Sequence, residues 1–245
     1  MPANQPTTGR GVEKGPGRFG PSGPSAVARA YEHAKARLLD GSLGPGDWLT
    51  EGEVADALGI SRTPVREAFL HLQAEGLLTL HPRRGAQVVG VDPATAAELL
   101  EVRHLLEHHA ATCVARAGEA VRRAVVVALE EVLASQVEAR RTGDRGRFVA
   151  LDRELHRRVV AASGNRVLEG LYGTLRDRQQ RLVLDGLRAD PSRAERILEE
   201  HRALLEALAE GDPAAYDRAL RRHLAGSLRA LRGAALDPDL AASDR

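Results

Sequence analysis

The sequence predicts a mainly α-helical chain in which a small mixed domain precedes a larger helical bundle. Three observations support this fold class. Residues 50–74 carry helix start and stop signals in close succession, and residues 77–89 place two short apolar segments around a turn. Residues 92–233 show helical periodicity interrupted only by short breakers. Because short loops join long helices, we expect antiparallel neighbours and a six-helix bundle.

Two tails are expected to flank these elements. Residues 1–25 are rich in glycine and proline and show no periodicity, so they are expected to be disordered. The acidic, proline-containing residues 234–245 are expected to form a loose tail. Between the first tail and residue 50 lies one predicted helix, whose apolar face carries Val27, Tyr31, Ala34 and Leu38.

Residues 50–72 predict two short helices separated by a tight turn. Thr50 and Glu53 have the spacing of a capping box, which satisfies two backbone N–H groups at a helix start. Gly59 ends that helix, because glycine enters the left-handed conformation at little cost. Ser61 is expected to cap the second helix, and Pro64 fits its first turn, where an N–H would be unpaired.

The second helix has two distinct faces, followed by a basic turn. Its apolar face carries Val65, Phe69 and Leu72. Arg62, Thr63 and Arg66 lie on the other sides of the helix. The turn Pro82-Arg83-Arg84-Gly85 lies between two short apolar segments, which predicts a hairpin with a basic tip. A recognition helix beside a basic wing is typical of a winged helix-turn-helix, so residues 26–91 predict a DNA-binding domain.

This stretch resembles the GntR family of transcriptional regulators. The resemblance runs through Gly41, Leu43, Pro45-Gly46, Leu49-Thr50-Glu51, residues 58–68, Leu72, Glu75-Gly76-Leu77 and Arg84-Gly85. It implies DNA contacts in the major groove and near the minor groove by Ser61, Arg62, Thr63, Arg66, Arg84 and Gly85. Some members carry a DNA-contacting arginine at the position of Gly52, and this chain has no side chain there.

Composition narrows the class of protein. The formal net charge is only +1, so DNA binding has to depend on a local cluster of basic residues. The single cysteine, Cys113, excludes an intramolecular disulfide and fits a reducing compartment. No apolar stretch opens the chain, and no segment approaches the ~20 apolar residues that span a bilayer. We therefore expect a cytoplasmic protein that does not enter the membrane.

The predicted bundle places polar residues where apolar ones are expected. Its helices run approximately over residues 93–117, 119–142, 145–162, 165–188, 191–210 and 213–232. The inward faces of the third, fifth and sixth carry Asp152, His156, His201 and His223. Each would cost a few kcal/mol if buried without a partner, and one divalent cation can ligate all four. One carboxylate and three imidazoles suit zinc first, and also nickel, manganese or iron.

Taken singly, these residues have ordinary explanations. An Asp-x-x-x-His pair is commonly a surface pair, and a lone core histidine is commonly a hydrogen-bonded packing residue. Three neighbouring histidines, His104, His108 and His109, are interpreted as bundle surface. The bundle resembles the FCD domain of the FadR subfamily, however, through residues 101–107, 152–165, 200–201 and 223. That resemblance implies metal ligation by an aspartate and three histidines in this order, with Leu155 replacing a common phenylalanine.

Arg103 is predicted to face the interior from the first bundle helix. A guanidinium there needs an anion, and its planar fork matches a carboxylate. Two interpretations remain open: Arg103 binds an organic-acid effector, or it forms a salt bridge with an acid of the bundle. Asn165 is interpreted as a helix cap.

Together these features predict a homodimeric repressor that binds a palindromic operator and responds to a small carboxylate at a divalent metal. A direct metal-ion sensor is an alternative. A metal-dependent hydrolase or lyase is a weaker one, because no general base or nucleophile motif lies beside the proposed ligands, and we expect no enzymatic activity. An acyl-CoA responder is disfavoured, because that branch of the family lacks the aspartate–histidine cage.

Overall fold

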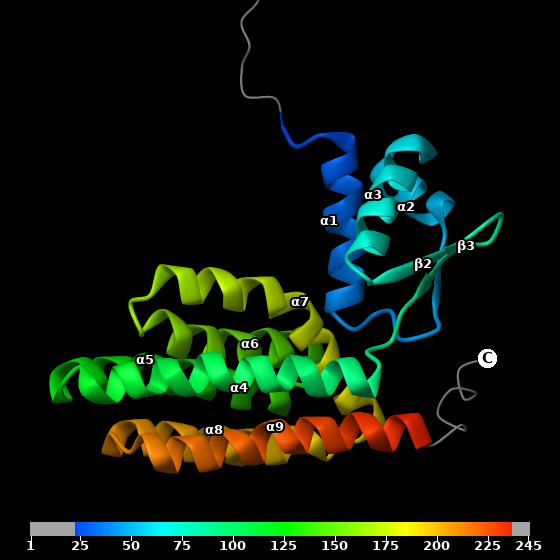
Figure 1. Cartoon of the computed structure of the whole chain (residues 1–245). Coiled ribbons are helices and arrows are strands. Elements are labelled where there is room, and N and C mark those ends of the chain that lie inside the picture. Colours follow the sequence, from blue (N-terminus) through cyan, green and yellow to red (C-terminus); the bar gives the residue numbers. More distant parts are fainter. Residues whose placement is uncertain (1–22, 237–245) are drawn as a thin grey trace, which may run out of the picture.

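The computed structural model describes residues 23–236, which form two packed regions (Figure 1). The smaller region comprises α1 (Ala26–Leu39), β1 (Trp48–Leu49), α2 (Glu51–Leu58), α3 (Arg62–Ala74), β2 (Leu78–His81) and β3 (Gly85–Val88). The larger one comprises α4 (Pro93–Arg116), α5 (Glu119–Arg141), α6 (Arg145–Ala161), α7 (Arg166–Ala189), α8 (Arg193–Glu210) and α9 (Pro213–Leu236). Each region has its own hydrophobic core, and the predicted fold class is confirmed. No helix among the described residues is long and apolar enough to cross a membrane.

The helix-turn-helix forms as its capping signals predict, with one exception. The Thr50 hydroxyl accepts a hydrogen bond from the Glu53 backbone N–H at 3.2 Å, and the Glu53 carboxylate accepts one from the Thr50 N–H at 2.7 Å. Gly59 ends α2 with φ of 63°. Ser61 occupies the N-cap position of α3, but the predicted capping bond is absent. Pro64 stands at the third helical position and has no N–H to donate to the Ser61 hydroxyl.

The wing hairpin forms at the predicted turn and gains a third strand that the sequence analysis missed. β2 and β3 pair antiparallel, with His81 opposite Gly85. β1 pairs antiparallel with β3, which places Trp48 opposite Gln87, so the strand order is β1-β3-β2. A strand of two residues is too short to show the alternation that identifies strands in a sequence.

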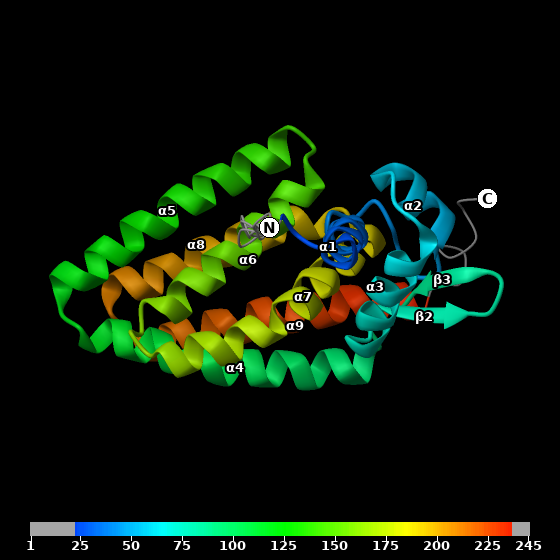
Figure 2. The same ribbon diagram turned by 90° about the horizontal axis from the view of Figure 1, so that it is seen from above.

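The bundle contains the six predicted helices, separated by the predicted breakers (Figure 2). The expected start of the C-terminal tail is wrong, because α9 continues through Leu236. The expected end of the N-terminal tail is also too late. Ser25 caps α1 by accepting a hydrogen bond from the Ala28 N–H at 3.1 Å. The remaining tail residues, 1–22 and 237–245, lie outside the described residues.

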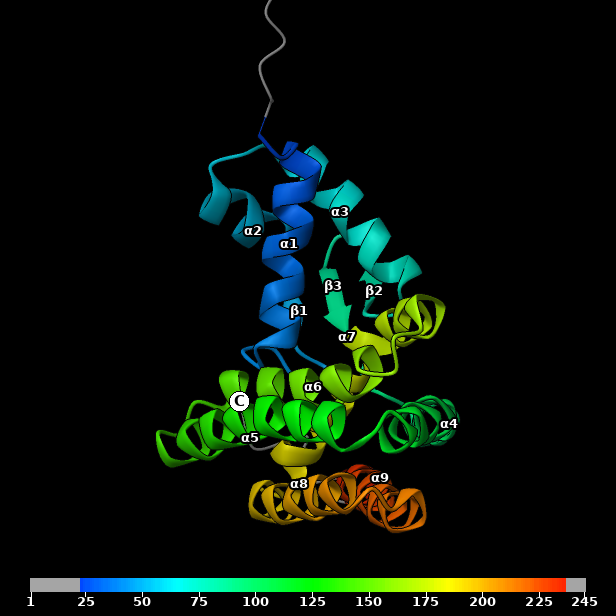
Figure 3. The ribbon, with the colours of Figure 1, turned by 90° about the vertical axis from the view of Figure 1, so that its left-hand side faces the viewer.

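Helix α7 lies on the side of the bundle that faces the winged domain (Figure 3). The buried Arg181 guanidinium donates hydrogen bonds to the backbone carbonyls of Leu77 and Val89, which flank the wing. The Lys35 ammonium on α1 pairs with the Asp177 carboxylate at 2.7 Å. These hydrogen bonds and this ion pair attach the DNA-binding domain to one helix of the bundle.

Candidate functional site

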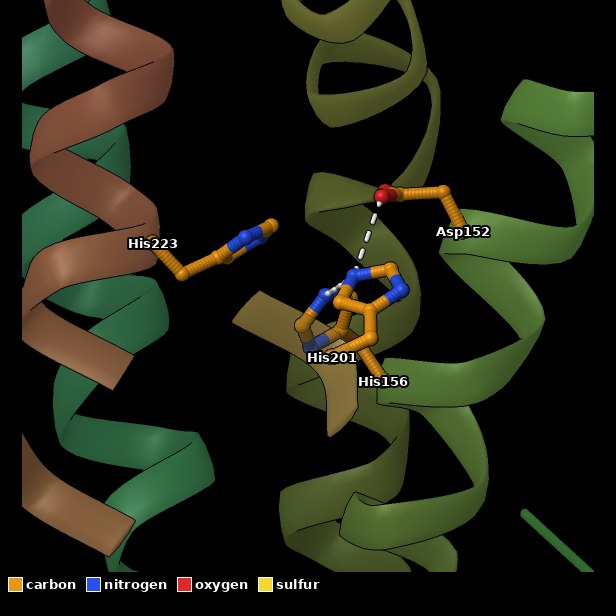
Figure 4. Close-up of side chains that lie close together, drawn as sticks. All are labelled: Asp152, His156, His201 and His223. Atoms are coloured by element: carbon orange, nitrogen blue, oxygen red, sulfur yellow. Dashed lines mark hydrogen bonds and ion pairs between the residues drawn. The ribbon is translucent and has the colours of Figure 1, made fainter. Parts of the chain in front are cut away.

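Four polar side chains meet in the centre of the bundle (Figure 4). α6 supplies Asp152 and His156, α8 supplies His201, and α9 supplies His223. All four are buried, and one potential ligand atom from each lies within 4.8 Å of the others. The inward directions predicted from helical periodicity are therefore confirmed, and three helices converge on one point.

Each histidine uses its Nδ1 atom for a contact outside this cluster. His156 Nδ1 lies 2.7 Å from a Glu107 carboxylate oxygen, and His223 Nδ1 lies 2.9 Å from a Glu200 carboxylate oxygen. His201 Nδ1 lies 2.8 Å from the side-chain oxygen of Gln136. Since these oxygens can only accept, the Nδ1 atoms donate and the Nε2 lone pairs remain available. Oriented imidazoles of this kind are typical of metal ligands.

The centre of the bundle leaves buried polar atoms without partners. His223 Nε2 and Asp152 Oδ1 form no hydrogen bond with a described residue, although Asp152 Oδ1 lies 3.3 Å from His201 Nε2. Arg103 Nη2 and the Tyr216 hydroxyl are also buried without a partner. Each such group costs about 1–3 kcal/mol if nothing binds it. Two free ligand atoms and two free donors therefore fit a cation together with an anion.

The protonation states also suit metal ligation. Burial alone would raise the pKa of the Asp152 carboxyl. The neighbouring His201, His156 and His223 lower this pKa by more, so its net value lies below the usual range and the carboxyl is ionised. Burial lowers the pKa of His223 well below its usual value, and His156 and His201 add to this effect. Burial and Arg103 likewise lower the pKa of His156. An ionised Asp152 beside His156 and His223 with lowered pKa values favours metal ligation, since a metal ion needs deprotonated ligands.

Arg103 is buried on α4, and both interpretations of it find support. Its Nε donates to the Glu107 carboxylate at 2.5 Å, so the predicted internal salt bridge is present. The Tyr172 hydroxyl donates to the same Glu107 oxygen at 2.8 Å. Arg103 Nη2 remains unpaired and buried, which leaves half of the guanidinium fork available for another anion.

Sequence reasoning assigned no role to the residues that support this site. Glu107, Gln136 and Glu200 hold the three imidazoles, yet only Glu107 and Glu200 were noticed, as part of the family resemblance. A usable signal existed for two of them. Glu107 stands four residues after Arg103, and Gln136 interrupts the buried face of α5. Both are polar residues at core positions of an amphipathic helix, which seldom occur without a partner.

The neighbouring histidines do not join the cluster. His104 Nε2 lies 2.6 Å from the Asp217 carboxylate on α9, and its ring stacks on that of His108. His109 is exposed and lies 3.6 Å from the Cys113 sulfur. The interpretation of these residues as bundle surface therefore holds for His109, whereas His104 and His108 are partly covered.

Four of the six predicted DNA-reading residues line one groove of the winged domain. A groove between α3 and the wing is lined in part by Arg62, Arg66, Arg84 and Gly85. Ser61 and Thr63 are exposed at the start of α3 but do not line this groove. At Gly52, a built Cβ would lie 3.7 Å from Arg62 Nη2. The Arg62 guanidinium therefore occupies the space beside that position.

These features define a class of protein: a winged helix-turn-helix DNA-binding protein whose helical domain encloses a buried polar cage. Residues 26–88 match the gntR family of bacterial regulatory proteins, and residues 98–226 match the FCD domain. The chain therefore belongs to the GntR family, with the FCD domain expected of the FadR subfamily. It is a DNA-binding transcriptional regulator and not an enzyme.

Comparisons over most of the chain agree. The chain is 33% identical to the HTH-type transcriptional regulator in an unstable DNA locus of Streptomyces ambofaciens, covering 79% of this chain and 80% of that one. It is 32% identical to the probable D-xylose utilization operon transcriptional repressor of Paenarthrobacter nicotinovorans, covering 79% and 83%. A GntR regulator structure from Rhodococcus sp. RHA1 shares the fold, with a TM-score of 0.68 and 21% identity over 89% of this chain and 99% of that one.

Proposed function

We propose that this chain is a cytoplasmic, homodimeric repressor whose operator affinity is controlled by a small organic acid bound at a divalent metal. The observation that carries the proposal is the set of unpaired buried atoms at the centre of the bundle: Asp152 Oδ1, His223 Nε2, Arg103 Nη2 and the Tyr216 hydroxyl. A cation alone would satisfy the first two, and an anion beside it would satisfy the last two.

The ligand set would be Asp152, His156, His201 and His223. One carboxylate oxygen and three imidazole nitrogens favour zinc, and they also accommodate nickel, manganese or iron. When bound, the ion supplies a Lewis-acid centre that attracts carboxylate oxygens. Glu107, Gln136 and Glu200 hold the imidazoles in place, which supports a site that is formed before the ion arrives.

The effector would be a small carboxylic acid held between the ion and α4. Arg103 Nη2 offers a charged donor, and burial raises the pKa of Tyr216 well above its usual value, so the phenol keeps its proton and can donate. Binding the acid would therefore need no further cationic side chain beside the four proposed metal ligands. An acid with one carboxylate at the ion and polar atoms near Arg103 and Tyr216 would fit these donors.

The DNA-reading surface would comprise Ser61, Arg62, Thr63 and Arg66 on α3 together with Arg84 and Gly85 on the wing. Five of these residues, Ser61, Arg62, Thr63, Arg66 and Arg84, are exposed, and Arg62, Arg66, Arg84 and Gly85 line one groove, which supports this assignment. Two copies related by a two-fold axis would place two such surfaces on a palindromic operator. The named repressor among the relatives supports repression as the mode of action.

Helix α7 offers a route between the two sites. Near its start, Tyr172 donates to Glu107, which in turn positions His156. About two and a half turns later, Arg181 donates to the backbone carbonyls of Leu77 and Val89 beside the wing. A change at the cage that displaces Tyr172 would therefore be transmitted to the wing by a single rigid element. A coupling of about 1–3 kcal/mol would change operator occupancy roughly 5- to 150-fold.

A screen of small carboxylic acids by thermal shift tests the proposed effector site. We expect an acid that raises the melting temperature of metal-loaded wild-type protein and does nothing to the metal-free protein. Tyr216→Phe, which removes the unpaired hydroxyl and keeps the Arg103–Glu107 pair, should weaken this response while leaving the metal content unchanged. If the metal-loaded protein responds to no acid and the ion alone changes operator affinity, the chain is a direct metal sensor instead.

A further inference from the structure

The outward face of the wing sheet carries an aromatic residue beside the basic tip. On β1, Leu49 is fully buried and Trp48 points the other way, partly exposed. Trp48 pairs with Gln87 of β3, and two residues earlier on β3 stands Gly85, opposite His81 of β2. Because side chains alternate along strands, Trp48, Gly85 and His81 lie on the same face of the sheet. That face is separate from the winged-domain core.

Arg84, at the tip of the hairpin, lies over this aromatic residue. Its guanidinium carbon is 4.6 Å from the centre of the Trp48 ring, within the distance of a cation–π contact. The His81 ring lies 5.0 Å from the Trp48 ring at an angle of 58°. The Arg84 side chain forms no hydrogen bond or ion pair with any residue in 23–236, so its stacking on Trp48 is its principal restraint.

Gly85 allows β1 to approach the tip closely. A Cβ built at Gly85 would lie 2.8 Å from the Leu49 carbonyl oxygen and 3.2 Å from Thr50 Cα, and the residue has φ of 105°. Any side chain at this position would push β1 away from the hairpin. The close approach of β1, which carries Trp48, to the hairpin is therefore set by the backbone.

We propose that Trp48 is a positioning residue for the wing arginine. Stacking holds the planar guanidinium by its face and leaves its N–H edge free to donate to a phosphate or a base edge. An arginine restrained before binding loses less rotamer freedom when it contacts DNA. The inference rests on the proposed DNA contact of Arg84 and adds a residue to which no role in DNA binding had been assigned.

The expected effect is modest and specific to Arg84. A cation–π contact at an exposed site corresponds to about a two- to fivefold change in affinity. Trp48→Leu, which keeps an apolar side chain on β1, should weaken operator binding by that factor. Trp48→Phe, which keeps an aromatic face, should stay within about twofold of wild type. The charge of Arg84 remains in both variants, so the salt dependence of binding should not change.

A double-mutant cycle tests the proposal. The affinity of each variant for a labelled operator duplex is measured by fluorescence anisotropy. Arg84→Ala should weaken binding at least as much as Trp48→Leu. It should also reduce the slope of log affinity against log salt concentration (the salt slope) by about one, the value for one phosphate contact. The double variant should bind like Arg84→Ala alone, because the stack has no function without the arginine. Trp48→Leu combined with Arg66→Ala is the control, and there the two losses should multiply.

Three results would overturn the assignment. The first is operator binding by Trp48→Leu that equals or exceeds that of wild type, and the second is a loss that multiplies with that of Arg84→Ala. The third is a reduced salt dependence of binding in Trp48→Leu, as in Arg84→Ala, which would indicate a collapsed wing. If Trp48→Leu does not fold, Trp48→Phe and Trp48→Val in the same cycle decide the question, since only an aromatic face should retain affinity. A normal affinity for Arg84→Ala would instead remove the wing arginine from the DNA-reading surface.

Discussion

The two domains use arginine in opposite ways. In the winged domain, Arg66 lies exposed on α3, where it is available to a partner outside the protein. In the bundle, Arg103 is only 1% exposed and pairs with Glu107, which also contacts His156 and Tyr172. The first arginine can be replaced without disturbing the fold, whereas the second belongs to a buried network. Binding and stability are therefore separable in one domain and linked in the other.

The largest effect should come from breaking the buried network. Glu107→Ala removes the partners of Arg103, His156 and Tyr172 at once. Leaving a buried charge without its partner should lower the free energy of unfolding by about 3–5 kcal/mol. Urea denaturation measures this loss. The matched control is Glu154→Ala on α6, which pairs with Arg157 and Arg158 at the surface and should cost less than about 1 kcal/mol because water screens the charges. Equal losses would contradict the comparison.

Metal removal should produce the next largest loss of stability, and this loss should depend on the ligands in the bundle. Dialysis against a chelator should lower the free energy of unfolding by about 2.7 kcal/mol if the free metal had been 100-fold above its Kd. His201→Ala should already lack the ion, so chelator should not change its melting temperature. A chelator effect of the same size in His201→Ala would locate the ion elsewhere.

Arg66→Ala should change binding and leave stability unaltered. Loss of a bidentate base contact should weaken operator binding by about 1–3 kcal/mol, measured in a gel-shift titration. The melting temperature and the metal content should stay at wild-type values, because the side chain is exposed. Arg141→Ala, on the exposed face of α5, is the control and should not alter operator affinity. Unchanged binding for Arg66→Ala would remove this residue from the reading surface.

The smallest expected effect is the difference between alanine variants of two glycines in the winged domain. Gly46 and Gly85 have φ of 87° and 105°, but only at Gly85 would a Cβ meet the backbone, at 2.8 Å from Leu49 O. Gly85→Ala should lower the free energy of unfolding by about 1–2 kcal/mol and weaken operator binding. Gly46→Ala should show the conformational cost alone and should bind the operator normally. Equal operator affinities in the two variants would show that β1 need not approach the wing.

The winged domain could be predicted closely because its signals are local. The capping box at Thr50 and Glu53, the end of α2 at Gly59 and the wing turn follow from residues only a few positions apart. β1 and the missing Ser61 cap escaped prediction for different reasons. A strand of two residues carries no pattern, and the effect of Pro64 on its own helix cap is easily overlooked.

The bundle could be predicted only in part, because its chemistry depends on distant partners. Periodicity correctly turned Asp152, His156, His201 and His223 inward. It could not show that Gln136 on α5 meets His201 on α8, or that Tyr172 on α7 meets Glu107 on α4, since these contacts depend on how the helices pack. The ligand candidates could therefore be read from the chain, whereas the residues that orient them required the structure.

The central claim is that an acid at a metal ion in the bundle changes how the wings bind DNA. Operator affinity, measured by fluorescence anisotropy in metal-free, metal-loaded and metal-plus-acid states of one preparation, tests it most directly. We predict that the acid changes the affinity by roughly 5- to 150-fold only when the metal is present. The same affinity in all three states, with metal content and acid binding confirmed, would contradict the account.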